Sequence, residues 1–243
     1  MTPVFDVLIN YWPKLLHGLG LTLLLTGISA ALAAAISLPL AIFRVNAGMA
    51  SQAPMRLYIS FMRGTPLLGQ LFLIYYGAGE FRAALQSIGV WGFFREPFNC
   101  AVLAFTLNSV AYQIEILRGG LMGVPAGQVE AAKAIGMSRF AAYRRVILPH
   151  AYRIAQPALG NEIILLMKGS AVASVITIFD LMGETKTVYA KTFDFSIYLW
   201  AALIYLAVTT LFVRVWRLLE KALNPHLAGH APAEAQHPVM GMR

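Results

Sequence analysis

Long apolar segments dominate the pattern of hydrophobic and polar positions along the chain. No Asp, Glu, Lys or Arg occurs between Lys14 and Arg44. About 20 mostly apolar residues are enough for a helix to cross the roughly 30 Å hydrocarbon core of a membrane, so this segment predicts a transmembrane span. Four further apolar segments predict spans at about residues 57–77, 98–117, 152–182 and 197–213. The pattern therefore predicts an all-α membrane protein with about five transmembrane helices.

The composition agrees with a membrane protein and limits the classes of function. The 243 residues are 58% hydrophobic and 12% charged, with a mean hydropathy of +0.66, whereas soluble domains are about 45–50% apolar and about 25% charged. In a soluble protein the net charge of +8 would suggest nucleic-acid binding. In a membrane protein basic residues mostly set the topology, so we expect no nucleic-acid partner.

The distribution of Lys and Arg predicts the orientation of the spans. Twelve of these residues fall in three segments, namely 44–56, 118–153 and the part of the chain after residue 213, and five fall in the segments at the opposite ends of the spans. Basic residues favour the cytoplasmic side of a membrane. We therefore expect a periplasmic N-terminus, a cytoplasmic loop at 118–153 and a cytoplasmic C-terminus.

The sequence shows no internal repeat and no linker that would separate two domains. We expect one transmembrane domain over residues 1–225, followed by a tail at 226–243. This tail is rich in Ala and Pro, a composition that cannot bury enough apolar surface to fold. It contains His226, His230 and His237, but we interpret it as a disordered cytoplasmic tail and predict no metal site.

A charged stretch in the loop at about 118–150 differs from the rest of the chain. Its sequence from Glu130 to His150 is EAAKAIGMSRFAAYRRVILPH. Gly136 suits the left-handed residue after a helix end, Ser138 can cap a second helix, and Pro149 is predicted to end it. Helices this short are marginal alone in water, so we expect the pair to dock in a groove of another protein. An amphipathic helix on the lipid surface is the alternative interpretation.

The same stretch carries a family resemblance. Glu130-Ala131-Ala132, then Gly136, then Val146-Ile147-Leu148-Pro149 resemble the EAA loop of permease subunits of ABC importers, with Val146 at a position where the family pattern has Ile. Arg63-Gly64-Thr65-Pro66-Leu67 and Arg118-Gly119-Gly120 resemble the polar amino-acid subfamily. The segment 99–108 is similar to M-type subunits for histidine, other basic amino acids or opines. The resemblance extends over about residues 15–225.

This resemblance implies a type I (MetI-like) permease fold with a cytoplasmic coupling helix, in the bacterial inner membrane. It implies four kinds of partner besides lipid: a second homologous permease subunit in a heterodimer, an ABC ATPase dimer, a periplasmic substrate-binding protein and the amino-acid substrate. It also implies ATPase coupling through eight residues: Glu130, Ala131, Ala132, Gly136, Ser138, Arg139, Leu148 and Pro149. The chain lacks a glycine-rich phosphate loop, so we expect no enzymatic activity and no bound cofactor, with ATP and Mg²⁺ used by the ATPase.

Polar residues inside the predicted spans are candidates for a substrate path, because an ionisable residue at membrane depth must face the protein interior or water. Asn108, Tyr112 and Glu115 fall on one helix face at i, i+4 and i+7. Asn161 and Glu162 are the candidates in the fourth span, and a carboxylate there can bind the cationic group of an amino acid. Two structural alternatives stay open: Glu162 can pair with a nearby Lys or Arg, and Asn108 can bond a neighbouring helix.

Two basic residues inside the spans, Arg63 and Lys168, are interpreted as gating or structural residues. Arg63 is expected to form an ion pair with Glu115 or to extend to the cytoplasmic surface. Many relatives have Lys-Asp-Thr/Ser-Ser where this chain has Lys168-Gly169-Ser170-Ala171. The absent Asp implies that a Q-type partner supplies more of the substrate contacts.

The favoured function is therefore a permease subunit of an ATP-driven importer for polar amino acids or opines. Basic amino acids such as histidine, arginine, lysine and ornithine are the expected substrates. The alternatives are a self-sufficient channel or secondary carrier for small polar solutes, and an assembly or signalling subunit without a substrate path.

Overall fold

The computed structural model describes residues 3–223 of the chain, so the predicted tail at 226–243 lies outside the described residues. This part of the chain is helical and contains no strand. Its elements are α1 (Pro3–Asn46), α2 (Ala53–Gly64), α3 (Leu67–Glu80), α4 (Arg82–Ser87), α5 (Trp91–Phe94), α6 (Pro97–Met122), α7 (Ala126–Ala134), α8 (Arg139–Ala142), η1 (Tyr143–Ile147), α9 (Leu148–Gly169), η2 (Ser170–Ile176), α10 (Leu181–Thr192) and α11 (Ser196–Leu223).

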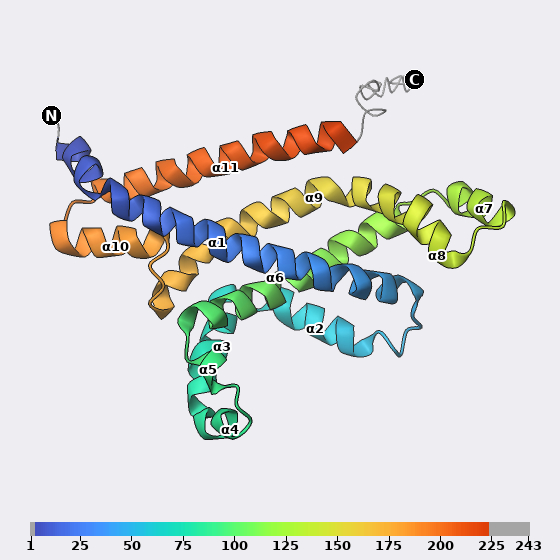
Figure 1. Ribbon diagram of the computed structural model, residues 1–243, viewed down its shortest axis with the longest axis horizontal. Coiled ribbons are helices and arrows are strands. Elements are labelled where there is room, and N and C mark those ends of the chain that lie inside the picture. The colour runs from blue at the N-terminus through green and yellow to red at the C-terminus, as the bar shows by residue number, and fades with distance from the viewer. Residues whose placement is uncertain (1–2, 224–243) are drawn as a thin grey trace, which may run out of the picture.

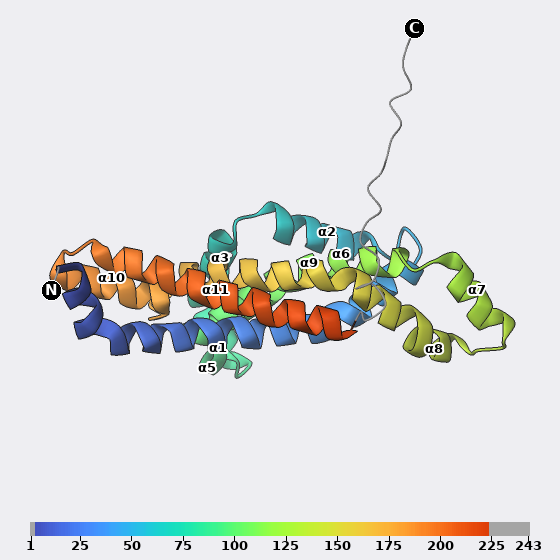
Figure 2. The same ribbon diagram turned by 90° about the horizontal axis from the view of Figure 1, so that it is seen from above.

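Four long helices, α1, α6, α9 and α11, form an elongated bundle (Figures 1 and 2). Helix α1 has 44 residues and is about 66 Å long at 1.5 Å per residue, so it extends beyond the hydrocarbon core. Its N-terminal part lies beside α10 at one end of the bundle, and α7 and α8 project from the other end (Figure 1). We call the latter the coupling end.

The described residues contain four helices that are long and apolar enough to span a membrane, or five if a bent pair counts as one span. The four are Phe5–Asn46, Pro97–Met122, Arg139–Ile176 and Ser196–Ala222. Helix α11 buries little of its apolar surface in the bundle, as expected for a helix that faces lipid. The prediction of an all-α membrane protein with about five spans is confirmed.

The second span, predicted at about residues 57–77, is a bent pair of helices. Helices α2 and α3 meet at an angle of 106°, and α3 leads away from the bundle to α4 and α5 (Figure 1). Pro66 has no N–H to continue the helix, and it restricts the preceding residue to extended conformations. Thr65 is extended accordingly, with φ −114° and ψ 148°.

The fourth span also differs from its prediction. Pro149 does not end a helix but lies in the first turn of α9, directly after the π-helical turn η1, and the helix continues past it. The second helix of the charged loop is thus the beginning of the fourth span, which continues through η1 as Arg139–Ile176. The span ends before Met182 because Thr177 is left-handed (φ 66°). Asp180 then caps α10 by accepting from the Gly183 N–H at 2.9 Å.

The centre of the bundle is apolar and joins elements that are far apart in sequence. Leu25, Leu71, Phe105, Leu166 and Ile176, from α1, α3, α6, α9 and η2, belong to one buried cluster. This cluster fixes the start of α3 against the bundle even though the rest of α3 leads away from it.

Small residues allow the closest approach between α6 and α9. A Cβ on Gly120 would overlap the carbonyl oxygen of Ala151 and would lie 3.0 Å from the Cβ of Ala155. Small residues at helix interfaces let membrane helices pack closely. This contact sets the position of α9, and with it the position of the charged loop.

Candidate functional site

The charged loop projects from the coupling end of the bundle as α7, a turn and α8 (Figures 1 and 2). The turn is centred on Gly136, which has φ +73°. The Gly136 N–H donates to Lys133 O at 3.0 Å and the Met137 N–H donates to Ala132 O at 3.1 Å, as in a glycine-terminated helix end. The prediction that Gly136 is left-handed after a helix end is confirmed.

The second predicted feature of the turn is the cap. The side chain of Ser138 accepts from the Ala141 N–H at 3.3 Å and begins α8, so the predicted cap is confirmed. Asn46 at the end of α1 donates a 2.7 Å hydrogen bond to the Tyr143 hydroxyl. This bond ties the loop to the first span.

The tip of the loop exposes large apolar side chains. Ile135 and Phe140 are 74% and 75% exposed, whereas Tyr143 and Ile147 pack against the bundle. The apolar side chains of this segment are therefore divided between the bundle and an exposed tip. An exposed apolar pair with charged neighbours suits a protein-docking surface.

The eight predicted coupling residues do not share one environment. Glu130, Ala131, Gly136, Ser138, Arg139 and Pro149 are exposed, Leu148 is half-buried and Ala132 is buried. A cavity of 360 Å³ lies on the inner side of the loop between α7, α8 and η1, and Asn46, Val129, Lys133, Met137, Arg139, Ala142, Tyr143 and Ile147 line it. Ala132 therefore shapes the loop, and the exposed residues are the ones available to a partner.

A second cavity, partly open to the surface, lies between α3, α6 and α9. Its volume is 160 Å³, and Leu67, Asn108, Tyr112, Glu162, Leu165 and Leu166 line it. Three of the five predicted path residues, Asn108, Tyr112 and Glu162, thus meet at one cavity. The guanidinium group of Arg63 lies 5.2 Å from the centre of the Tyr112 ring, a cation–π distance.

Glu162 is buried and held by α6. One carboxylate oxygen accepts a 2.6 Å hydrogen bond from Ser109, and the other accepts from Gln113 at 3.4 Å. The Gln113 carbonyl in turn accepts from Ser37 of α1 at 3.1 Å. Neither Lys168 nor Arg153 pairs with Glu162 within the described part of the chain, so that structural alternative is wrong.

Asn108 is also bonded to neighbouring elements, as its structural alternative predicted. Its amide donates to Gln70 Oε1 at 3.0 Å and to Met62 O at 3.2 Å. The buried Gln70 donates to Thr65 as well and so holds the bend between α2 and α3.

Ser109 and Gln113, the two partners of Glu162, were not among the residues predicted from the sequence. Their i, i+4 spacing in an apolar helix was the available signal, because residues at this spacing share one helix face.

The other two path candidates lie elsewhere. Glu115 accepts from Arg118 at 3.1–3.2 Å and pairs with Arg44, so the expected ion pair with Arg63 is wrong. Asn161 is exposed and lines a different cavity, of 230 Å³, beside α11. Lys168 is exposed and forms no ion pair with another described residue.

Comparison with known proteins decides the family. Residues 27–225 match the family described as "Binding-protein-dependent transport system inner membrane component". The chain belongs to this family. The predicted resemblance to ABC importer permeases is thereby confirmed, and the chain is a multi-pass component of a membrane transport system.

Individual relatives of this permease cover almost its whole length. The nopaline transport system permease protein NocM of Agrobacterium fabrum is 41% identical over 95% of this chain and 98% of its own. The octopine transport system permease protein OccM of Rhizobium radiobacter is 41% identical over 87% and 86%. The histidine/lysine/arginine/ornithine transport system permease protein HisM of Escherichia coli K12 is 37% identical over 92% and 98%.

Solved structures confirm the predicted fold class. A chain of "an amino acid ABC transporter with histidines" superposes with a TM-score of 0.78 at 35% identity, over 91% of this permease and 100% of that chain. The MetNI methionine ABC transporter gives a TM-score of 0.73 at 17% identity, over 88% and 98%. The second likeness concerns the fold alone and agrees with the MetI-like prediction.

Proposed function

We propose that this permease subunit carries basic amino acids or opines across the bacterial inner membrane as part of an ATP-driven importer. The observation that carries the proposal is the meeting of Asn108, Tyr112 and Glu162 at one cavity between α3, α6 and α9. A buried carboxylate beside a cavity favours a cationic ligand, because a charge-assisted bond compensates for its desolvation. The substrates named for the relative HisM, which include lysine and arginine, support this substrate class.

A second permease subunit completes the substrate site in this proposal. The cavity of 160 Å³ is smaller than the roughly 300–1,000 Å³ of typical ligand pockets. Gly169 adds no side chain to it, although a Cβ there would lie 3.3 Å from Leu67, one of the lining residues. The small volume and the missing acidic residue both favour a heterodimer whose partner supplies further contacts.

The exposed tip of the charged loop docks on a separate ABC ATPase dimer, which binds ATP and Mg²⁺ and performs the hydrolysis. Ile135 and Phe140 supply apolar contact area, and Glu130 and Arg139 lie exposed in the same loop. Because η1 joins the loop to the fourth span without a break, a displacement of the tip is transmitted directly to α9. A periplasmic binding protein delivers the substrate at the opposite end.

The coupling end faces the cytoplasm in this arrangement. Basic residues are in excess at this end: the ends of α1, α6 and α11 that point toward it carry Arg44, Arg118 and Arg217, and η1 next to the projecting loop carries Arg144 and Arg145 (Figure 1). This excess favours the cytoplasmic side. The N-terminus is then periplasmic and the end of α11 cytoplasmic.

Uptake into proteoliposomes tests the proposal. The permease is reconstituted with a second permease, an ABC ATPase and a binding protein from the same organism, and uptake of radiolabelled arginine, histidine and octopine is measured with and without internal ATP. We expect ATP-dependent uptake that is lost when either permease is omitted. Uptake by this chain alone, without ATP, would identify a channel or secondary carrier and overturn the proposal.

A further inference from the structure

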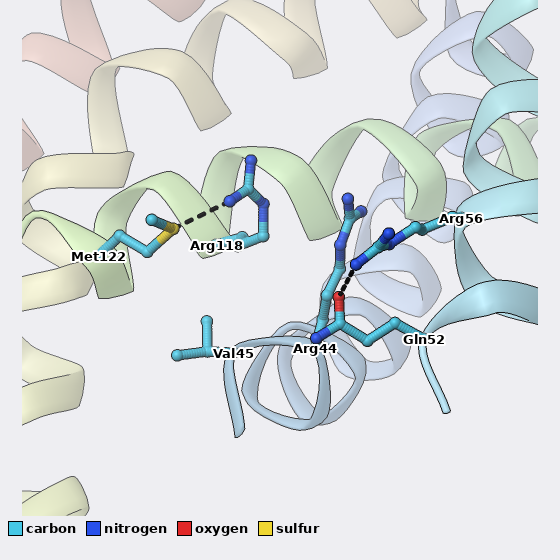
Figure 3. Close-up of a pocket in the computed structure, with 6 residues that line it drawn as sticks. All are labelled: Arg44, Val45, Gln52, Arg56, Arg118 and Met122. Atoms are coloured by element: carbon cyan, nitrogen blue, oxygen red, sulfur yellow. Dashed lines mark hydrogen bonds between the residues drawn. The ribbon is translucent and has the colours of Figure 1, made fainter. Parts of the chain in front are cut away.

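A basic pocket at the coupling end is separate from the substrate cavity. It has a volume of 390 Å³ and lies where the end of α1, the start of α2 and the end of α6 meet (Figure 3). Its lining consists of Arg44, Val45, Gln52, Arg56, Arg118 and Met122. Three of these six side chains carry guanidinium groups.

The positive charge of this basic pocket is only partly neutralised. Arg44 and Arg118 share one carboxylate, that of Glu115. Arg56 forms no ion pair with any residue from 3 to 223, and its guanidinium donates at 3.2 Å to the neutral amide oxygen of Gln52 (Figure 3). Three guanidinium groups against one carboxylate leave a net charge of +2, which an anion would compensate.

The geometry favours a phosphate as that anion. Guanidinium groups present several N–H donors in a plane and bind phosphate oxygens in pairs. The side chains of Arg44 and Glu115 are only 13% and 18% exposed, so one wall of the pocket is rigidly held. Arg56 is exposed and is free to turn toward a ligand.

The surroundings favour a lipid over a soluble phosphate. Met122 in the lining is 65% exposed, and Met49 and Leu57, which are close in sequence to the lining residues Gln52 and Arg56, are 77% and 73% exposed. An amphipathic ligand fits both the positive charge and the exposed apolar side chains, because its headgroup neutralises the arginines and its acyl chains cover Met122, Met49 and Leu57. Basic pockets between transmembrane helices on the cytoplasmic side suit anionic headgroups.

We infer that this basic pocket binds the phosphate headgroup of an anionic phospholipid at the end of α1, α2 and α6. Such a lipid compensates for the excess charge beside the Glu115 ion pairs and joins the bent second span to the first and third spans. The inference does not depend on the transported substrate, and it is tested by a binding measurement that involves no transport.

Native mass spectrometry of the assembled transporter tests the inference. The detergent-solubilised complex is titrated with phosphatidylglycerol or phosphatidylcholine, and the bound lipid is counted. We expect preferential retention of phosphatidylglycerol. Arg56→Gln should weaken the retention of phosphatidylglycerol about five-fold, because a basic residue near a membrane surface contributes about 1 kcal/mol. Arg56→Lys, which keeps the charge but loses the paired donors, should weaken it less. Arg214→Gln removes an exposed arginine of α11 outside the pocket and should have no effect.

Three results would overturn the inference. Equal retention of both lipids would show that the pocket does not select an anion. Equal weakening in Arg56→Gln and Arg214→Gln would show general surface attraction instead of a site. Displacement of phosphatidylglycerol by millimolar inorganic phosphate, with no acyl-chain dependence, would assign the pocket to a soluble phosphate.

Discussion

Ser109 on α6 donates a 2.6 Å hydrogen bond to Glu162 on α9, inside the bundle. Glu162 also lines the cavity between α3, α6 and α9. One carboxylate therefore bonds two spans together and faces the space where we place the substrate. The structural role of Glu162 and its contact with the substrate can be tested separately, because one substitution can remove its charge and another can remove its hydrogen bonds.

Glu162→Gln removes the charge and keeps an oxygen that accepts from Ser109. We expect the variant to assemble with nearly unchanged thermal stability, but to transport arginine with kcat/KM lowered roughly 10- to 100-fold, since a hydrogen bond to a charged group contributes about 1.5–3 kcal/mol. Uptake in proteoliposomes and melting in detergent are the two measurements.

Glu162→Ala provides the matched control. It leaves the Ser109 hydroxyl and the Gln113 amide without their acceptor, so we expect a loss of about 1–3 kcal/mol of stability together with the loss of uptake. If Glu162→Gln transports arginine normally, the carboxylate is purely structural and the substrate path lies elsewhere.

Neighbouring glycines on α6 test the contact between α6 and α9. A Cβ on Gly120 would overlap Ala151 O, whereas a Cβ on Gly119 would meet no atom within 4 Å. We expect Gly120→Ala to destabilise the bundle by about 1–3 kcal/mol through overpacking. Gly119→Ala should stabilise it by up to about 1 kcal/mol, because alanine favours a helix over glycine. Equal melting temperatures in detergent for the two variants would contradict this packing.

The sequence predicted local backbone features more reliably than the course of whole spans. Gly136 and Ser138 adopt their predicted conformations because a left-handed turn and a helix cap depend on a few adjacent residues. The effects of Pro66 and Pro149 depend on longer context. The same residue type bends one span at position 66 and occupies the first turn of a helix at position 149, and apolar periodicity does not distinguish these cases.

The polar partners inside the bundle could not be predicted for a related reason. Helical spacing places Asn108 and Glu115 on one face, but it does not say which helix that face meets. Glu115 pairs with Arg44, 71 positions away, because the ends of α1 and α6 adjoin. Arg63 was the partner of Glu115 expected from the sequence. Instead, α2 ends at the bend and the Arg63 guanidinium lies over the Tyr112 ring.

Accessibility of single cysteines tests the proposed orientation. Cys100 is buried and is first replaced by alanine. Cysteines are then introduced at Ser138 in the charged loop and at Glu80 at the end of α3, both exposed. A membrane-impermeant maleimide added to spheroplasts should label Glu80→Cys and not Ser138→Cys. Labelling of Ser138→Cys from outside would reverse the topology and exclude a cytoplasmic ATPase from the loop.

The turn at Gly136 tests the coupling role of the charged loop. With φ +73°, a side chain with a Cβ costs roughly 1–2 kcal/mol at this position. If docking requires this turn, Gly136→Asp should weaken binding of the ATPase about 5- to 30-fold, the equivalent of that energy. Gly136→Asn should have a smaller effect, because it strains the turn no more than aspartate does and adds no charge. The bundle should remain assembled, since a Cβ at Gly136 would meet no atom within 4 Å.

Gly127→Asp is the matched control for this substitution. Gly127 lies in the same loop at the start of α7, has no positive φ, and would accept a Cβ without a contact within 4 Å. It adds the same charge without the backbone strain. Co-purification of the ATPase and its hydrolysis of ATP, stimulated by loaded binding protein, are measured for both variants. A loss confined to Gly136→Asp assigns coupling to the turn, an equal loss in both assigns it to charge alone, and normal hydrolysis in Gly136→Asp would exclude this turn from coupling.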